Sequence, residues 1–405
     1  MTEDRDMRQQ IGRREFIRRG TLAGVVATTG IPMLPPNATG VASEPSAAPA
    51  SLAVDTTSTP ALATRHLDSR AFCLSQYDVL KPALSFSATN PASARRWQQR
   101  ARARLIERLG GFPSSRAPLD AEVLETTDLG GYTREKIVFN TRENLSTIGY
   151  LLLPKNAPRP LPAVVCFSGH GRGLGDILGI ADDGSQRAER NVGYAKEYAL
   201  QCVEHGYATF AVEQLAFGTR RDDAARRSGP GTESCRPAAC AALLFGQTMA
   251  GWRVWDAMRS IDYLATRREV DTSRVATLGA SGGGTTSLLT AACDRRVNAA
   301  VVSAYFNTFR DSIVSISHCP DNYVPGMLQD LEMYDIAGLV APRALFVESG
   351  RKDRIFPIAG YERAVGKARE IYDVYAVADR FGAETHDGAH EVHLVGAFDF
   401  LRRAL

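Results

Sequence analysis

The sequence Arg274-Val275-Ala276-Thr277-Leu278-Gly279-Ala280-Ser281-Gly282-Gly283 decides the fold. An apolar run of strand type leads into the pattern G-x-S-x-G, and the segment 285–293 that follows is helical in pattern. Glycines beside Ser281 permit a sharp strand-to-helix turn, because larger side chains would clash there. Such a turn exposes the Ser281 hydroxyl at a helix N-terminus, where the helix dipole favours negative charge. The arrangement suits a nucleophile that attacks a carbonyl group.

Two segments further along the chain supply an acid and a base. The apolar segment 346–350 runs into a loop that carries Asp353, and the loop 387–393 carries His390. The order Ser, Asp, His is one in which a catalytic triad occurs on a sheet of alternating strands and helices. We therefore predict Ser281 as the nucleophile, His390 as the base that takes its proton, and Asp353 as the acid that orients the base.

Neighbouring residues leave alternatives open. His393 is an alternative base, and Glu348 is a weaker alternative acid. The trio His386, His390 and His393 also suggests a metal site, but H-E-x-H at 390–393 is one residue short of the H-E-x-x-H zinc motif. Gly388 argues against one continuous helix through the trio. We predict no metal site and no cofactor.

Taken together, these features resemble the α/β-hydrolase superfamily over about residues 120–405. Further motifs are similar to the branch of exported bacterial hydrolases that contains acetylxylan esterases, cephalosporin deacetylases and dienelactone-hydrolase-like enzymes. These motifs are Trp255-Asp256, Asp262-Tyr263-Leu264, and the segments 270–275, 341–345 and 353–357. The resemblance implies ester hydrolysis through an acyl-enzyme. It also implies a catalytic histidine in a Gly-x-His turn, which selects Gly388-Ala389-His390.

The resemblance also implies where the negatively charged oxygen of the reaction intermediate would bind. The donors would be the backbone N–H of Gly282 and that of Arg172, which lies in the loop after the apolar segment 162–167. Acetylxylan esterases usually carry Tyr at the position of Arg172, so the pocket wall differs here. Glu213 and Arg220 are candidate substrate contacts, with a helix cap or a surface ion pair as the alternative for each.

Alternation of strand-like and helical segments predicts an α/β fold with a mostly parallel sheet and helices on both faces. Strands are expected at 132–140, 146–154, 162–167, 208–213, 274–278, 299–303 and 344–348, and helices at 97–109, 191–205, 246–267, 285–293, 361–374 and 395–405. The insertions 172–191 and 214–245 show little periodicity. We expect them to form a rim or lid over the site, with a disordered surface loop as the alternative.

The N-terminal region is predicted to lie outside the hydrolase domain. Arg13-Arg14-Glu15-Phe16-Ile17-Arg18 matches the twin-arginine export pattern, and a mildly apolar stretch follows it. The predicted division is a signal peptide over 1–43, a linker over 44–64, an N-terminal helical extension over 65–120 and the hydrolase domain over 121–405. The expected location is the periplasm or the outside of the cell, with no membrane association once the signal is removed.

Charge and cysteine content exclude other classes. The 405 residues carry a net charge of +3, which gives no reason to expect a nucleic-acid partner. No C-x-x-C occurs among the seven cysteines, which excludes zinc-ribbon and thioredoxin-type motifs. Cys235 and Cys240 lie in a Pro-containing loop and could pair in an oxidising compartment. The other five lie mostly in apolar segments, which predicts buried thiols.

The function predicted from the sequence is hydrolysis of carboxylic esters by a serine hydrolase. Small acyl groups on carbohydrates or other polyols are the expected substrates. One alternative is a dipeptidyl-peptidase-like serine peptidase, which the absence of propeller repeats before residue 121 disfavours. Another is a catalytically inactive binding protein with a hydrolase fold, which an intact Ser, Asp and His disfavour. The oligomeric state is left open.

Overall fold

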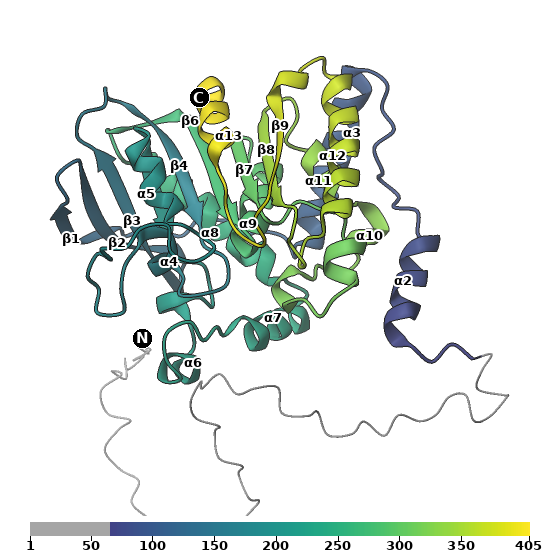
Figure 1. The fold of residues 1–405 in the computed structure, drawn as a ribbon, viewed down its shortest axis with the longest axis horizontal. Helices are drawn as coiled ribbons and strands as arrows, with labels where there is room; N and C mark the ends of the chain where they lie inside the picture. Colours follow the sequence, from purple (N-terminus) through teal and green to yellow (C-terminus); the bar gives the residue numbers. More distant parts are fainter. Residues whose placement is uncertain (1–64) are drawn as a thin grey trace, which may run out of the picture. The chain divides into compact units, whose positions relative to one another are not determined.

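A nine-stranded sheet forms the centre of the computed structural model, which describes residues 65–405 (Figure 1). In spatial order the strands are β1 (Glu122–Asp128), β2 (Tyr132–Arg142), β3 (Leu145–Pro154), β5 (Ala208–Val212), β4 (Leu161–Phe167), β6 (Val270–Ala280), β7 (Val297–Ser303), β8 (Ala344–Gly350) and β9 (Phe381–His386). From β1 to β5 neighbouring strands are antiparallel, and from β5 to β9 they are parallel. The predicted mostly parallel α/β sheet is confirmed.

Each face of the sheet has its own apolar core. In β4, Ala163 and Val165 belong to one core, whereas Val164 and Cys166 belong to the other. The first core is covered by α3 (Pro91–Arg108), α8 (Met249–Leu264), α9 (Gly282–Cys293), α11 (Met333–Gly338) and α12 (Ile358–Val374), and the second by α4 (Leu174–Leu178), α5 (Tyr198–Glu204) and α13 (Val395–Ala404). Because both faces are covered, the central strands are continuous apolar runs in the sequence.

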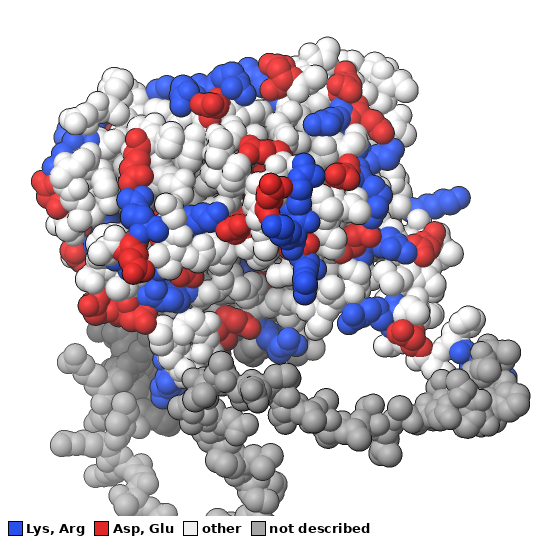
Figure 2. All heavy atoms as spheres, in the orientation of Figure 1, with Lys and Arg blue, Asp and Glu red and all other residues white. Residues whose placement is uncertain are grey.

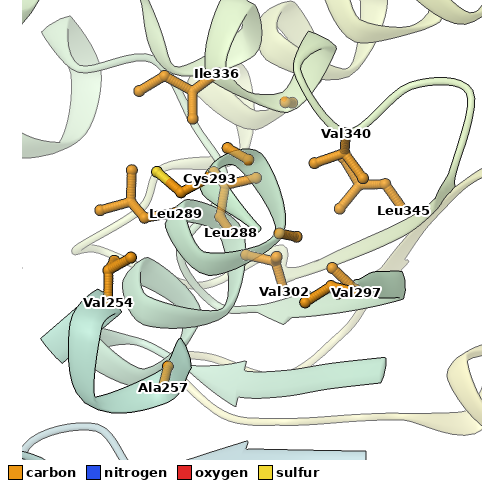
Figure 3. Close-up of a cluster of buried hydrophobic side chains, with 14 of the residues drawn as sticks. Val254, Ala257, Leu288, Leu289, Cys293, Val297, Val302, Ile336, Val340 and Leu345 are labelled. Atoms are coloured by element: carbon orange, nitrogen blue, oxygen red, sulfur yellow. The ribbon is translucent and has the colours of Figure 1, made fainter. Parts of the chain in front are cut away.

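Helix α9 lies at the centre of the first core. Figure 3 shows Leu288 and Leu289 of α9 close to Val254 of α8 and to Val302 of β7. All residues of α9 are buried, because helices and the sheet surround it. Full burial of a Leu side chain contributes roughly 1.5–3 kcal/mol, so this packing fixes the N-terminus of α9 firmly.

Helices also occupy the regions where the sequence shows little periodicity. The insertion at 214–245 contains the 3-10 helix η1 (Gly218–Arg220), α6 (Asp223–Arg227) and α7 (Cys235–Leu244), and α4 lies in the insertion at 172–191. Cys235 and Ala239 of α7 pack with Phe217 and Met249 in a small third apolar cluster. The insertions are therefore folded parts of the molecule and not disordered loops.

The cysteine predictions are partly wrong. Cys235 is buried and Cys240 is exposed, and both are free thiols on α7. Residues five apart on a helix point in different directions, so these two cannot pair while the helix persists. The expectation of buried thiols is right for Cys166, Cys202 and Cys293, whereas Cys73 is exposed and Cys319 is half-buried.

The region 65–120 contains two helices, α2 (Ser69–Val79) and α3. Trp97, Ala101 and Leu105 place α3 in the first core. The signal peptide and linker predicted over 1–64 lie outside the described residues. Within residues 65–405 no helix combines the length and apolar character that crossing a bilayer requires. Basic and acidic side chains are interspersed on the face shown in Figure 2.

Candidate active site

Ser281 occupies the turn between β6 and α9. Its φ of 54° and ψ of −123° are unusual for a residue with a side chain. The turn is held by a hydrogen bond from the Ser281 N–H to the carbonyl oxygen of Ser303 (3.0 Å). A Cβ on Gly279 would collide with the carbonyl of Gly283, and one on Gly283 would collide with that of Phe167. The two glycines are therefore required for the close packing that presents Ser281.

His390 and Asp353 form a hydrogen-bonded pair. His390 lies in the loop between β9 and α13, and its Nδ1 is 2.8 Å from Oδ2 of Asp353, which follows β8. The other oxygen of Asp353 accepts the N–H groups of Ile355 (2.8 Å) and Phe356 (3.0 Å). Burial acts to raise the pKa of Asp353, but the hydrogen bonds from His390 and these amides outweigh it and lower that pKa. The ionised carboxylate holds His390 with its proton on Nδ1.

Two aromatic rings enclose the imidazole of His390. The ring of Tyr194 lies 5.9 Å away on centroids and that of Phe356 lies 5.7 Å away, both nearly parallel to it. The Tyr194 hydroxyl is buried close to the backbone of Gly169, and no group within residues 65–405 accepts its proton. Burial raises the pKa of Tyr194, so the hydroxyl remains a proton-carrying donor. Tyr194 cannot be predicted from the sequence, because nothing in its local pattern distinguishes it.

Ser281 and His390 line the same cavity, which has a volume of about 340 Å³. Its other lining residues are His170, Tyr194, Ile316, Ser317, His318, Cys319 and Ile355. Asp353 is buried behind His390. The structure thus brings together three predicted residues that are separated by up to 109 positions in the sequence. Burial of the acid, partial exposure of the histidine and access to the serine are what proton transfer from a hydroxyl to an imidazole requires.

The alternative base and the alternative acid are engaged elsewhere. Nδ1 of His393 is 2.6 Å from Oε1 of Glu384, and its ring stacks on that of His386. His393 does not line the cavity of Ser281. Buried Glu348 accepts hydrogen bonds from the Ser303 hydroxyl (2.6 Å) and from the N–H groups of His393 and Leu394 (2.8 Å each). Its role in this arrangement is to hold the ends of β7 and of the histidine loop together.

The two predicted oxyanion donors differ in their surroundings. Gly282 is the first residue of α9, and the ring of His170 lies beside it. The N–H of Arg172 donates to Oδ2 of Asp176 (2.8 Å), and the Arg172 side chain lines a second cavity of about 660 Å³. The structure therefore does not present the Arg172 N–H as a free donor toward Ser281.

The two candidate substrate contacts also separate. Glu213 is buried at the wall of the second cavity, where it accepts the N–H groups of Leu174 and Thr219 (3.2 Å each). Burial raises the pKa of Glu213 to about 7. The Arg220 side chain is buried in an ion pair with Asp256 (2.6 Å) and lines neither cavity. Arg220 therefore takes the alternative role of an ion pair, although a buried one.

Two groups within residues 65–405 bring together side chains of the kinds that bind metals. One consists of Glu348, Glu384 and His393, and the other of His170, Cys235, Cys319 and Asp321. Neither group is the histidine trio considered from the sequence. In the second group, hydrogen bonding with Cys235 lowers the pKa of the Cys319 thiol to about 6 against the opposing effect of burial.

Comparison with known proteins agrees with the fold. Residues 53–387 match the model of the Abhydrolase family. The Bacillus subtilis (strain 168) protein named "Putative hydrolase YtaP" is 25% identical over 284 residues, which cover 69% of this chain and 89% of that protein. The fold is similar to that of "a putative acetyl xylan esterase" from Bacteroides fragilis NCTC 9343, with a TM-score of 0.69 and 19% identity over 80% of this chain and 82% of that one. It is also similar to that of a glucuronoyl esterase from Solibacter usitatus, with a TM-score of 0.56 and 18% identity over 80% and 97% of the chains.

Proposed function

This chain belongs to the Abhydrolase family and is an α/β-hydrolase related to acetylxylan esterases, and from that premise we propose that it is a serine esterase. The observation that carries the proposal is one cavity lined by a serine in a strained turn and by a histidine bonded to a buried carboxylate. A serine hydroxyl alone is a weak nucleophile, and an adjacent oriented base is what activates it.

The proposed reaction begins with attack of Ser281 Oγ on the ester carbonyl. Because Nδ1 of His390 donates to Asp353, Nε2 is the nitrogen free to accept the serine proton. Asp353 then stabilises the imidazolium through the same hydrogen bond. His390 gives the proton to the departing alcohol, which leaves an acyl group on Ser281. A water molecule, activated by the same histidine, hydrolyses that acyl-enzyme and restores the hydroxyl.

The tetrahedral intermediate requires donors for its oxyanion. The N–H of Gly282 stands at the N-terminus of α9, where it has no partner within the helix. The second donor predicted from the sequence, the Arg172 N–H, would serve only after release from Asp176. The Tyr194 hydroxyl is an additional candidate, because Tyr194 lines the same cavity and no group within residues 65–405 accepts the proton of its hydroxyl.

The proposed substrates carry small acyl groups on a carbohydrate-like alcohol. A cavity of about 340 Å³ that already holds the catalytic side chains at its walls suits a short acyl chain. The second cavity is lined by Lys136, Arg172, Glu213, Arg221 and Arg226, and these polar groups suit hydroxyl-rich ligands. The names of two proteins of similar fold, an acetyl xylan esterase and a glucuronoyl esterase, support carbohydrate esters. The twin-arginine pattern at 13–18 supports action in the periplasm or outside the cell.

The experiment that tests the proposal compares Ser281→Ala with the wild type on p-nitrophenyl acetate. We expect at least about a 10³-fold loss of kcat/KM in Ser281→Ala. Ser317→Ala is the matched control, since Ser317 lines the same cavity without a partner among the acid–base residues. A fluorophosphonate should label the wild type at Ser281. Full activity of folded Ser281→Ala would refute the serine mechanism.

The same protein preparations decide between the proposal and its alternatives. Amide substrates cleaved at rates close to those of esters would favour a peptidase. A folded wild-type protein that neither reacts with the fluorophosphonate nor hydrolyses any ester in a panel of acyl lengths would favour a binding protein without catalytic activity.

A further inference from the structure

Four potential metal ligands lie together beside the Ser281 cavity, and two of them, His170 and Cys319, line it. They are His170 in the turn after β4, Cys235 at the start of α7, and Cys319 and Asp321 at the 3-10 helix η3 (Pro320–Asn322). One ligand atom from each residue lies within 4.8 Å of the corresponding atoms of the other three. Nε2 of His170 is 3.3 Å from Sγ of Cys235 and 3.5 Å from Oδ2 of Asp321.

The two separations from Nε2 of His170 match those of tetrahedral zinc ligands. Bonds of about 2.3 Å to sulfur and about 2.0–2.2 Å to nitrogen and oxygen place neighbouring ligands of a tetrahedron roughly 3.3–3.8 Å apart. Both measured distances from His170 fall within this range. The ligand types point the same way, because thiolate and imidazole together favour zinc over magnesium or calcium.

The charge around the group also fits a divalent cation. Two thiolates and the carboxylate of Asp321 would carry three negative charges, and the guanidinium of Arg253, 2.6 Å from Asp321, supplies one positive charge. Asp321 and Arg253 are both buried, where unbalanced charge is costly. A cation of charge two makes the sum zero. Arg253 would then orient the Asp321 carboxylate from the outer shell.

The second group of possible ligands differs from the first in having no thiol, whereas carboxylates in both groups already accept hydrogen bonds, those of Asp321 coming from Arg253 and Asn322. In the group of Glu348, Glu384 and His393, the carboxylates already accept hydrogen bonds from backbone N–H groups and from the histidine. The sulfurs of Cys235 and Cys319 have only weak hydrogen-bonding capacity, yet they face His170 and Asp321. A metal ion is the partner that would satisfy all four side chains at once.

We propose that His170, Cys235, Cys319 and Asp321 bind one zinc ion in a closed, structural site. Binding needs both sulfurs as thiolates and would release to solvent any proton that they still carry, so affinity should rise with pH. The ion would join the turn after β4, helix α7 and the loop at η3, which are far apart in the sequence. Four protein ligands leave no open position, so the ion would support the cavity wall rather than take part in chemistry.

One consequence rests on the proposed function. A zinc ion on Nε2 of His170 would leave the ring proton on Nδ1. The ring lies close to Gly282, since a Cβ added to that glycine would be 3.5 Å from Nδ1. The ion would therefore fix the ring, its tautomer and the turn next to the proposed oxyanion donor. Loss of the metal should then lower kcat more than it raises KM, whereas metal binding itself should not depend on catalysis.

Cobalt binding to the full chain tests the site without relying on activity. The purified protein is reduced, freed of metal with a chelator and titrated with Co²⁺. We expect thiolate-to-cobalt charge-transfer absorption and tetrahedral d–d bands that saturate at one ion per chain and disappear when Zn²⁺ is added. Ser281→Ala should give the same spectrum, which separates failure of this proposal from failure of the esterase proposal.

Variants assign the ligands. Cys235→Ser and Cys319→Ser should each weaken cobalt binding at least about tenfold and reduce the charge-transfer band. Cys240→Ser is the matched control, because Cys240 lies on the same helix but is exposed, and it should bind as the wild type does. Asp321→Asn should weaken binding while leaving the charge-transfer band of the remaining complex in place.

Three outcomes would overturn the proposal. The first is the absence of tetrahedral cobalt absorption in the reduced wild type, a measurement that needs no variant to fold. The second is an unchanged spectrum in both Cys235→Ser and Cys319→Ser. The third is a Cys235–Cys319 disulfide, found by mass spectrometry in protein purified without reductant, together with no metal binding after reduction.

Discussion

Two histidines of one loop, His390 and His393, are each hydrogen-bonded to a carboxylate, but only His390 lines the cavity of Ser281. His390 is bonded to Asp353, whose side chain is fully buried, and its ring is enclosed by Tyr194 and Phe356. His393 is bonded to Glu384 at a similar distance, but both side chains are partly exposed. A short hydrogen bond to a carboxylate is thus common to both pairs.

The difference between the pairs lies in their surroundings. In the His390 pair, the acid is shielded from water and the other side of the imidazole faces a serine across a cavity. In the His393 pair, the imidazole stacks on His386 and the carboxylate also accepts the N–H of Gly396, which holds the start of α13. A histidine–carboxylate pair therefore suits general base catalysis only where a substrate group can meet it.

The largest expected effect comes from removing each histidine in turn. His390→Ala should lower kcat on p-nitrophenyl acetate by about 10⁴-fold or more, because it removes the carboxylate-bonded base proposed to take the proton of Ser281. His393→Ala should change kcat less than about fivefold, since it removes only a partly exposed ion pair. Steady-state kinetics on both folded variants measures the contrast. A larger loss in His393→Ala would exchange the roles assigned to the two residues.

Substitution of Asp353 should likewise lower kcat far more than substitution of Glu384, although the loss should be somewhat smaller than for the histidines. Asp353→Asn should reduce kcat by about 10³–10⁴-fold, because the amide favours the wrong tautomer of His390. Glu384→Gln keeps an acceptor and should stay within a few-fold of the wild type. The comparison uses kcat values from variants whose circular dichroism matches that of the wild type. Equal losses in the two variants would show that burial of the acid does not distinguish the pairs.

Glu213 extends the comparison to a buried carboxylate without a histidine partner. Its pKa is raised from 4.5 to about 7 by burial, so the folded state binds its proton more tightly than the unfolded state. Its contribution to stability is fully present below about pH 4.5 and is lost as the pH rises through about 7. The loss amounts to roughly 3 kcal/mol.

Glu213→Gln should therefore reduce the fall in unfolding free energy between pH 4.5 and 7.5 by roughly that amount. Urea unfolding of the wild type and the variant across this range measures the difference. Glu332 and Asp335, whose pKa values burial also raises, contribute equally to both proteins and cancel. Identical pH profiles would mean that Glu213 is ionised at low cost in the folded protein.

The smallest expected effect on kcat comes from Tyr194, whose ring packs beside His390 of the first pair. Tyr194→Phe keeps the ring beside His390 and removes a hydroxyl whose proton no group within residues 65–405 accepts. We expect kcat to fall about tenfold if the hydroxyl donates to the substrate, while stability stays unchanged. Tyr150→Phe, in the wall of the other cavity, is the control. Unchanged kcat in Tyr194→Phe would limit Tyr194 to a packing role.

Much of the fold follows from local patterns, because a buried parallel strand must be apolar throughout. The runs at 162–167, 299–303 and 344–348 predict β4, β7 and β8 for that reason. Strand β9 at the sheet edge was missed, since Phe381–His386 mixes polar residues and is only partly buried. Helix α7 was predicted as a loop, because Gly-, Arg- and Pro-rich flanks concealed its Ala-rich centre.

The residues of the candidate site also divide into those that local sequence patterns predict and those that they do not. Ser281, Asp353 and His390 were predicted because each stands at a recognisable junction of a strand with a loop or helix. Tyr194 and the group around Cys235 were not, since their importance depends on neighbours from distant segments. The separate roles of Arg172 and Arg220 likewise depend on Asp176 and Asp256, with which no sequence spacing pairs them.

The sequence by itself determined the alternating α/β architecture, the sharp turn at Ser281 and the chain order of acid and base. Strand burial and the steric demands of a glycine-flanked turn act over a few residues, and a few residues are enough to reveal them. Only the tertiary structure decided which histidine shares a cavity with the serine, which aspartate each arginine contacts, and that two cysteines, a histidine and an aspartate lie together beside that cavity. Those outcomes depend on how the insertions pack over the ends of the strands, and packing between distant segments leaves no periodic pattern along a chain.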